Sequence, residues 1–176
     1  MVKLRPAVFL DRDGVLSIPS IRNNKSYAPR EFKNFKLYPG VKKCISRLRK
    51  AGYKLIVVTN QPDIGNKLMD ESELKKMHEK IYKDLLVDEI FVCVHKQDDK
   101  CDCRKPRPGM LYSAIKKYSI DINKSFLIGD RSSDIEAASK VNCKSIFIDR
   151  KYDEEYPSSQ KHTVNSFNKA VDYILG

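Results

Sequence analysis

The sequence predicts an α/β fold of the Rossmann-like type: a parallel sheet with helices on both faces, in a single domain over residues 1–176. Three observations predict it. Short runs of β-branched or aromatic residues alternate with stretches that have helical spacing of apolar positions. The run LIVV at 55–58 is apolar without interruption, as in strands that helices cover on both faces. A length of 176 residues suits one compact domain.

The elements follow one another in regular alternation. In chain order we expect strand 7–10, helix 41–51, strand 54–58, helix 71–86, strand 89–94, helix 109–118, strand 125–128, helix 133–141, strand 144–148 and helix 164–175. The first helix has apolar residues three and four positions apart: Val41, Cys44, Ile45, Leu48 and Ala51. Gly52 then ends that helix, as a residue just past the last turn often does.

Three connections lack a periodic pattern. Residues 17–38 are long and rich in Ser, Asn, Lys and Pro, which is unusual unless the loop has a function, so we expect a loop that covers the substrate. Residues 96–108 hold two cysteines and several basic residues. The polar segment 151–161 is expected to be a mobile link before the last helix.

The formal charge is +11, from 34 basic and 23 acidic residues. It has two interpretations, a site for anionic ligands or a lysine-rich solvated surface, and the scattered lysines favour the second. The longest apolar run, 90–94, is far shorter than the roughly 18 residues of a membrane span. The opening segment also has no signal-peptide pattern. We therefore expect a soluble cytoplasmic protein without membrane contact.

Polar residues follow each predicted strand, where ligands bind in open parallel sheets. Asp11 is the last anchored residue of its strand and suits a nucleophile that forms an aspartyl phosphate. Asp13, two residues on, suits the proton carrier. Lys105 and Thr59 would balance the charge of a phosphate, and Asp130 would complete a Mg²⁺ shell. These residue types together indicate phosphoryl transfer.

Four short motifs stand in order at these strand ends: Asp-x-Asp-Gly at 11–14, Thr-Asn-Gln at 59–61, Arg-Lys-Pro at 104–106 and Gly-Asp-x-x-x-Asp at 129–134. Over roughly residues 7–150 the set resembles the haloacid-dehalogenase-like (HAD) phosphatases. The resemblance implies a HAD-type sheet and a phosphoric monoester hydrolase. It implies a Mg²⁺ site among the residues Asp11, Asp13, Asp130 and Asp134, and catalytic roles for Asp11, Asp13, Thr59 and Lys105.

A cluster of cysteines and histidine follows the third sheet strand. It supplies three thiolates and one imidazole: Cys93, His95, Cys101 and Cys103. This is the closed tetrahedral set of a structural Zn²⁺ site, which has no open position for chemistry. The metal would fold the loop immediately before Arg104 and Lys105 and so fix this basic pair against the phosphate.

Such a zinc loop resembles two groups that lack a cap domain, the D,D-heptose 1,7-bisphosphate phosphatases and the histidinol-phosphate phosphatases. The stretches CDCRKPRPGM and VVTNQPDIG favour the first group, whereas the five-residue spacing between His95 and Cys101 favours the second. The sequence departs from the usual motifs at Val15, Pro62 and Arg131. The expected reaction is hydrolysis of the 7-phosphate of D-glycero-D-manno-heptose 1,7-bisphosphate, in surface-polysaccharide (lipopolysaccharide) heptose synthesis. The alternative is histidinol phosphate, in histidine synthesis.

Arg104 is the residue expected to select the substrate, because a planar guanidinium can hold a second phosphate with two hydrogen bonds. The other expected substrate-binding residues are Asn60, Gln61, Arg131 and Tyr27. A polynucleotide 3′-phosphatase is a further alternative, but the chain has no Trp and no basic run interleaved with aromatics. We expect a small phosphorylated sugar as the partner, no nucleic acid, and a monomer.

Overall fold

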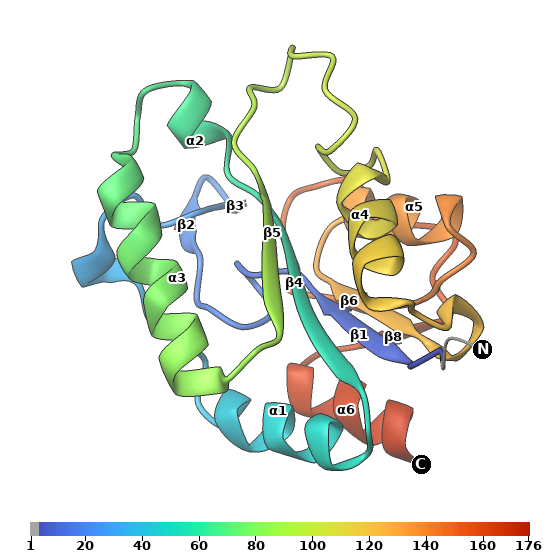
Figure 1. Ribbon diagram of the computed structural model, residues 1–176. Helices are drawn as coiled ribbons and strands as arrows, with labels where there is room; N and C mark the ends of the chain where they lie inside the picture. The colour runs from blue at the N-terminus through green and yellow to red at the C-terminus, as the bar shows by residue number, and fades with distance from the viewer. Residues whose placement is uncertain (1–3) are drawn as a thin grey trace.

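The computed structural model describes residues 4–176, so residues 1–3, where the predicted domain and its opening segment begin, lie outside the described part. Six parallel strands form one sheet in the order β5-β4-β1-β6-β7-β8 (Figure 1). Their bounds are β1 (Ala7–Leu10), β4 (Lys54–Asn60), β5 (Glu89–Cys93), β6 (Phe126–Gly129), β7 (Lys144–Ile148) and β8 (His162–Val164). The parallel sheet predicted from the sequence is confirmed.

Helices cover both faces of the sheet (Figure 1). One face packs against α1 (Val41–Lys50), α3 (Glu71–Leu85) and α6 (Phe167–Leu175). The other packs against α4 (Gly109–Tyr118) and α5 (Ser132–Lys140). The shorter elements are the helix α2 (Pro62–Gly65) and the 3₁₀ turns η1 (Phe32–Asn34) and η2 (Ile122–Lys124).

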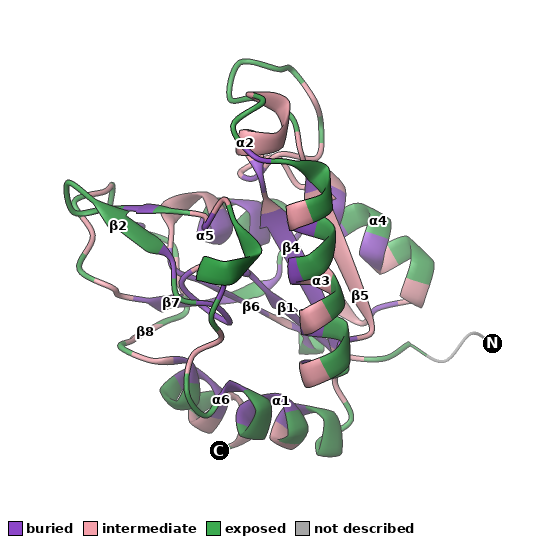
Figure 2. Ribbon diagram, turned by 90° about the vertical axis from the view of Figure 1, so that its left-hand side faces the viewer, coloured by how far each residue is buried: buried purple, intermediate pink, exposed green. Residues whose placement is uncertain are grey.

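The central strand β1 is buried on both faces, because alternate side chains of a strand point to opposite sides. Val8 and Leu10 pack in the core under α1, α3 and α6. Ala7 and Phe9 pack in the core under α4 and α5. The inner strands are accordingly drawn as buried in Figure 2. This explains why the sequence of β1 is apolar at every position instead of at alternate ones.

Several short elements were not expected: the helix α2, the two 3₁₀ turns, the edge strand β8 and the two strands of a hairpin. The loop 17–38 contains an antiparallel hairpin, β2 (Ser20–Arg22) and β3 (Lys25–Tyr27). Asn23 and Asn24 both have positive φ in its two-residue turn, a conformation that asparagine tolerates. The edge strand β8 was also missed, and the predicted start of the last helix at residue 164 is wrong. The Ser166 side chain accepts from the Lys169 backbone N–H, so that α6 begins at Phe167.

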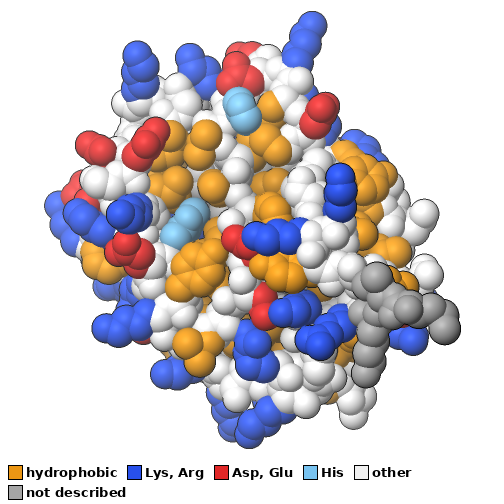
Figure 3. Space-filling model, in the orientation of Figure 1, with side chains coloured by type: hydrophobic (Ala, Val, Ile, Leu, Met, Phe, Trp, Pro, Cys, Tyr) orange, Lys and Arg blue, Asp and Glu red, His pale blue; other side chains and the backbone are white. Residues whose placement is uncertain are grey.

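The described residues hold no cap domain separate from the sheet and its helices. The hairpin β2–β3 and the helix α2 lie at the ends of the strands (Figures 1 and 2). On the face shown in Figure 3, Lys and Arg side chains are spread widely, with Asp and Glu among them. Within residues 4–176, every helix is too short or too polar to cross a membrane.

Candidate active site

The carboxyl ends of β1, β4 and β6 surround a cavity of about 540 Å³ that also borders the hairpin and the loop before α4. Nine of the residues predicted for the site line this cavity: Asp11, Asp13, Tyr27, Thr59, Asn60, Arg104, Lys105, Arg131 and Asp134. Gln61 and Asp130 are buried next to them. The sheet topology therefore brings the predicted residues to one place, because parallel strands present their carboxyl ends at the same edge.

A buried lysine is the centre of the charge arrangement. Lys105, only 4% exposed, directs its Nζ to Asp11 Oδ1 at 2.8 Å, to Asp134 Oδ1 at 2.5 Å and to the Val58 carbonyl at 2.7 Å. Burial alone would lower the pKa of Lys105, but the two carboxylates outweigh it and raise the pKa above its ordinary value. The lysine is thus held as a cation.

The backbone of Lys105 is fixed by a side chain from β4. Asn60 Oδ1 accepts from the Lys105 N–H at 3.1 Å, and Asn60 Nδ2 donates to the Lys105 carbonyl at 3.0 Å. This reciprocal pair ties the loop before α4 to the end of β4. The predicted substrate-binding residue Asn60 therefore also sets the position of the lysine.

Three carboxylates lie close enough together to share a cation. Oxygens of Asp11, Asp130 and Asp134 all lie within 4.8 Å of one another. Both carboxylate oxygens of Asp130 are buried without a hydrogen-bond partner in residues 4–176. Burial raises the pKa of Asp11 to about 6, and burial with the charges of Asp11 and Asp134 raises that of Asp130 well above its usual range. One lysine cannot balance three carboxylates, so the donor set fits a hard divalent cation such as Mg²⁺.

Gly14 makes room for this cluster. A Cβ at Gly14 would lie 1.7 Å from Asp130 Oδ2, and the residue has a φ of +92° that L side chains rarely adopt. The glycine of the Asp-x-Asp-Gly motif is therefore required both by its backbone angle and by the approach of Asp130.

The Asp13 carboxylate lies beside the cluster and is held by neighbours. Ser17 Oγ donates to its Oδ1 at 2.9 Å, and Gln61 Nε2 donates to its Oδ2 at 2.9 Å. Gln61 Nε2 also lies 2.9 Å from Thr59 Oγ1, so it fixes two predicted catalytic residues at once. The predicted role of Asp13 as a Mg²⁺ ligand stays a prediction.

Arg12 is a buried residue beside the site to which the sequence analysis gave no role. It is completely buried, and its Nε and Nη2 lie 3.0 and 2.8 Å from Asp13 Oδ2. Its Nη1 reaches His78 Nε2 on α3 at 3.4 Å. The sequence feature that could have drawn attention to Arg12 is its position between two aspartates at the end of a strand.

Arg30 and Asp63 also line the cavity, and the sequence did not single out either of them. Arg30 Nε donates to Asp63 Oδ2 at 2.7 Å, which links the segment after the hairpin to α2. Arg104, the predicted substrate-selecting residue, lines the cavity too, and its Nη1 is buried without a hydrogen-bond partner in the described part of the chain. Arg30 and Asp63 are 33 positions apart, so no local sequence pattern could have predicted that they pair.

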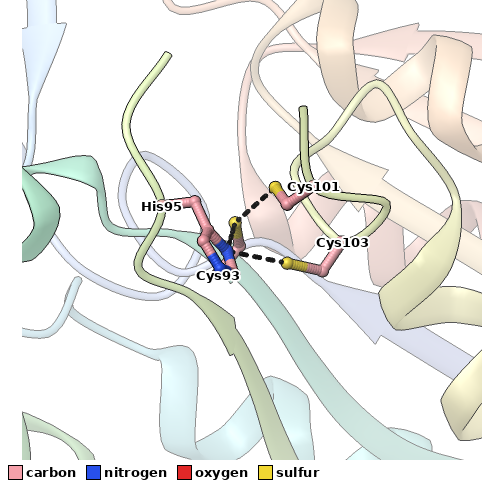
Figure 4. A group of neighbouring side chains, drawn as sticks. All are labelled: Cys93, His95, Cys101 and Cys103. Atoms are coloured by element: carbon pink, nitrogen blue, oxygen red, sulfur yellow. Dashed lines mark hydrogen bonds between the residues drawn. The ribbon is translucent and has the colours of Figure 1, made fainter. Parts of the chain in front are cut away.

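The four predicted zinc ligands converge from the two ends of the loop after β5 (Figure 4). Cys93 Sγ lies 3.7 Å from Cys101 Sγ, and His95 Nδ1 lies 3.5 Å from Cys93 Sγ and 3.3 Å from Cys103 Sγ. Tetrahedral Zn²⁺ with Zn–S bonds of about 2.3 Å separates two sulfurs by about 3.8 Å. The side chains therefore fit a closed zinc site, and the sulfurs are too far apart for a disulfide.

Paired aspartates, a buried lysine and a carboxylate pocket for a cation, at the ends of parallel strands, define a hydrolase of the phosphoryl-transfer class. Residues 18–148 match the family described as haloacid dehalogenase-like hydrolase. The chain belongs to this family, as its four motifs predicted.

Curated relatives have a more specific name. A D-glycero-beta-D-manno-heptose-1,7-bisphosphate 7-phosphatase of Photorhabdus laumondii is 39% identical over 145 residues, which are 76% of this chain and 74% of the relative. The protein of the same name from Escherichia coli K12 is 35% identical over 154 residues, covering 81% and 78% of the two chains. Among solved structures, the D,D-heptose 1,7-bisphosphate phosphatase from B. bronchiseptica, complexed with magnesium and phosphate, matches with a TM-score of 0.83. It has 27% sequence identity and covers 97% of this chain and 98% of its own.

Proposed function

We propose that this chain is a Mg²⁺-dependent phosphatase that removes the 7-phosphate of D-glycero-D-manno-heptose 1,7-bisphosphate, in surface-polysaccharide heptose synthesis. The observation that carries the proposal is the contact of Lys105 with Asp11 and Asp134, beside the Asp130 carboxylate, which has no hydrogen-bond partner within residues 4–176. The names of relatives at 35–39% identity support the heptose substrate over histidinol phosphate. We further propose that the enzyme acts as a monomer in the cytoplasm.

The first half of the reaction forms a bond to Asp11. A carboxylate oxygen of Asp11 attacks phosphorus, the bond from phosphorus to the sugar oxygen breaks, and an acyl phosphate remains on Asp11. Asp13 gives a proton to the leaving oxygen. Lys105 and the Thr59 hydroxyl face the phosphate and oppose its negative charge.

The second half releases phosphate. Asp13, now ionised, takes a proton from a water molecule that attacks the same phosphorus, and the bond between phosphorus and Asp11 breaks. Its oxygens are held by Ser17 and Gln61, so the carboxylate keeps one orientation through both proton transfers. A Mg²⁺ ion held by Asp11, Asp130 and Asp134 would neutralise charge on the phosphate oxygens.

Arg104 supports a bisphosphate as substrate. Arg104 lines the cavity next to Lys105, and its Nη1 has no hydrogen-bond partner within residues 4–176, so its guanidinium could give a second phosphate two parallel hydrogen bonds. Histidinol phosphate offers a cationic amine instead, which Arg104, Lys105 and Arg131 would repel. In this proposal Tyr27 and Asn60 contact the sugar. Zn²⁺ held by the Cys/His cluster keeps the loop that carries Arg104 folded.

The test is phosphate release from the heptose bisphosphate beside histidinol phosphate, with Mg²⁺ and with EDTA. We expect a Mg²⁺-dependent preference of about a hundredfold or more for the bisphosphate, worth about 2.7 kcal/mol of transition-state binding. The matched inactive control is Asp11→Asn, which should lower turnover by a factor on the order of 10³ or more while its circular dichroism spectrum stays native. Preference for histidinol phosphate, or release that EDTA does not affect, would contradict the proposal.

A further inference from the structure

The hairpin β2–β3 borders the active-site cavity but has little core of its own. Each of its strands has three residues, and of the six only Ser26 is buried. In Figure 2 it stands out from the sheet and its helices. A two-stranded hairpin is only marginally stable alone in water. Its position must therefore depend on a few specific contacts with the rest of the molecule.

Those contacts converge on the backbone of Ser26. Its N–H donates to Glu154 Oε1 at 3.1 Å, and its carbonyl accepts a hydrogen bond from Arg131 Nη2. Arg131 Nη2 lies 3.4 Å from the same Glu154 oxygen. One partly buried ion pair thus holds both backbone groups of the buried hairpin residue. The Asp153 N–H adds a bond to the Asn24 carbonyl at 2.8 Å.

The geometry of the hairpin explains why Ser26 is the residue held. It is the partner of Ile21 in the antiparallel ladder, and alternate residues of such a ladder turn their N–H and C=O groups away from the partner strand. Both groups of Ser26 are therefore open to Glu154 and Arg131. The same nitrogen, Arg131 Nη2, lies against both the Ser26 carbonyl and Glu154 Oε1.

This clamp of Ser26, Arg131 and Glu154 acts on groups that line the cavity. Ser26 itself, the next residue Tyr27, and Arg131 all border the space where substrate would lie. A shift of the hairpin would move Tyr27 and free the Arg131 side chain. Lys105 donates to both Asp11 and Asp134, and among residues 4–176 none of the three is hydrogen-bonded to the hairpin, so their arrangement would stay.

We propose that Glu154 is a positioning residue for substrate selection: it fixes the hairpin and Arg131, and through them the part of the cavity that contacts the sugar. The inference rests on the proposed function for the identity of the substrate. It assigns a role to the polar segment 151–161, which lies outside the four motifs.

The experiment compares Glu154→Ala with Glu155→Ala, its matched control, since Glu155 is an exposed neighbour in the same segment. For Glu154→Ala we expect the KM for the heptose bisphosphate to rise about tenfold with kcat within about twofold, as for loss of a binding contact. Turnover of p-nitrophenyl phosphate, which lacks the sugar and the second phosphate, should stay within about twofold. The Ser26 amide should exchange with solvent about tenfold faster. Glu154→Gln keeps an acceptor for Ser26 and should recover part of the exchange protection.

Equal KM values and equal Ser26 exchange in the Glu154→Ala and Glu155→Ala variants would overturn the inference. A similar loss of turnover on both substrates, with a lower melting temperature, would also overturn it, because that pattern indicates a structural role only. Failure of the wild-type enzyme to hydrolyse the bisphosphate would contradict the proposed function instead, and the amide exchange would still test the clamp.

Discussion

Buried Arg12 forces its neighbour His78 to stay neutral. An arginine has only donors, so the 3.4 Å contact between Arg12 Nη1 and His78 Nε2 requires an imidazole nitrogen that accepts. Burial first, and then the charge of Arg12, lower the pKa of His78 to about 4. In the unfolded chain the same group takes up a proton near its ordinary pKa of about 6.5.

The stability of the fold should therefore fall as the pH is lowered from about 6.5 towards 4, the window in which the unfolded chain binds the extra proton. For His78 alone, the free energy of unfolding should be about 2 kcal/mol lower at pH 5 than at pH 7. His78→Gln keeps an acceptor for Arg12 but does not titrate. Urea titrations at the two pH values should show a pH dependence that is smaller by about this amount in the variant.

The control for this measurement is His162→Gln, since His162 is exposed on β8 and stacks on Tyr173. This variant also loses a histidine but keeps the contact between Arg12 and His78, so the reduction specific to His78 should be absent from it. Other titrating groups, including Asp11, are common to all three proteins and cancel in the comparison. The same pH dependence in His78→Gln and in the wild type would show that His78 does not carry the effect.

Single residues also show which parts of the site a sequence can predict. Asp11 and Lys105 were predictable, because the motifs fix residue type and the strand ends fix location. The burial of Arg12 was not, since it depends on His78 arriving from a helix 66 positions later. The role of Glu154 was harder to predict, because its partner is the backbone N–H of Ser26. Every residue except proline has such an N–H, so the sequence gives no sign of the contact.

At the scale of elements, a helix or strand can be predicted from the sequence when it is long enough to show a pattern of apolar residues. The ten residues of α1 repeat their apolar spacing often enough to show it, and the run in β4 has no helical spacing. The strands β2, β3 and β8 have three residues each, too few for any periodicity. What defines them is pairing with a neighbour, and pairing is a property of the tertiary structure.

Three of the four candidate zinc ligands, His95, Cys101 and Cys103, lie in the loop between β5 and α4, and the fourth, Cys93, ends β5. The loop has no regular structure between Cys93 and Gly109, and its end is tied by the bond from the Gly109 N–H to the Asp102 carbonyl at 3.0 Å. Such a loop has little apolar burial, so bound metal should supply much of its stability. Lys105 lies in this loop, so the stability of the loop should also affect the position of Lys105 in the active site.

Cys101→Ser should lower bound zinc and the melting temperature together, the latter by about 5 °C or more. Metal content is measured by mass spectrometry of the elements, and unfolding by calorimetry on the same samples. The control is Cys44→Ser, because Cys44 lies in α1 away from the cluster and its loss should leave zinc content unchanged. Unchanged stability of a zinc-free Cys101→Ser protein would refute the folding role of the metal.

At the scale of the whole molecule, the two hydrophobic cores share the sheet as a common wall. Leu48 of α1 belongs to the core on one face and Leu111 of α4 to the core on the other. The residues of β1 contribute alternately to both cores. Neither core can therefore unfold without removing the strand against which the other core packs. This is the physical reason to propose that the chain is one cooperative domain.

Leu48→Ala and Leu111→Ala should therefore each shift one and the same unfolding transition. Both leucines are almost completely buried, and such a truncation costs about 2–5 kcal/mol, which lowers the melting temperature of a chain this size by about 10 °C. Calorimetry on the zinc-loaded proteins should show a single peak whose calorimetric and van't Hoff enthalpies agree. Leu4→Ala, at an exposed leucine, is the control and should shift the peak by no more than about 2 °C. A second peak in either core variant would mean that the faces unfold separately, and the chain would then contain two cooperative units.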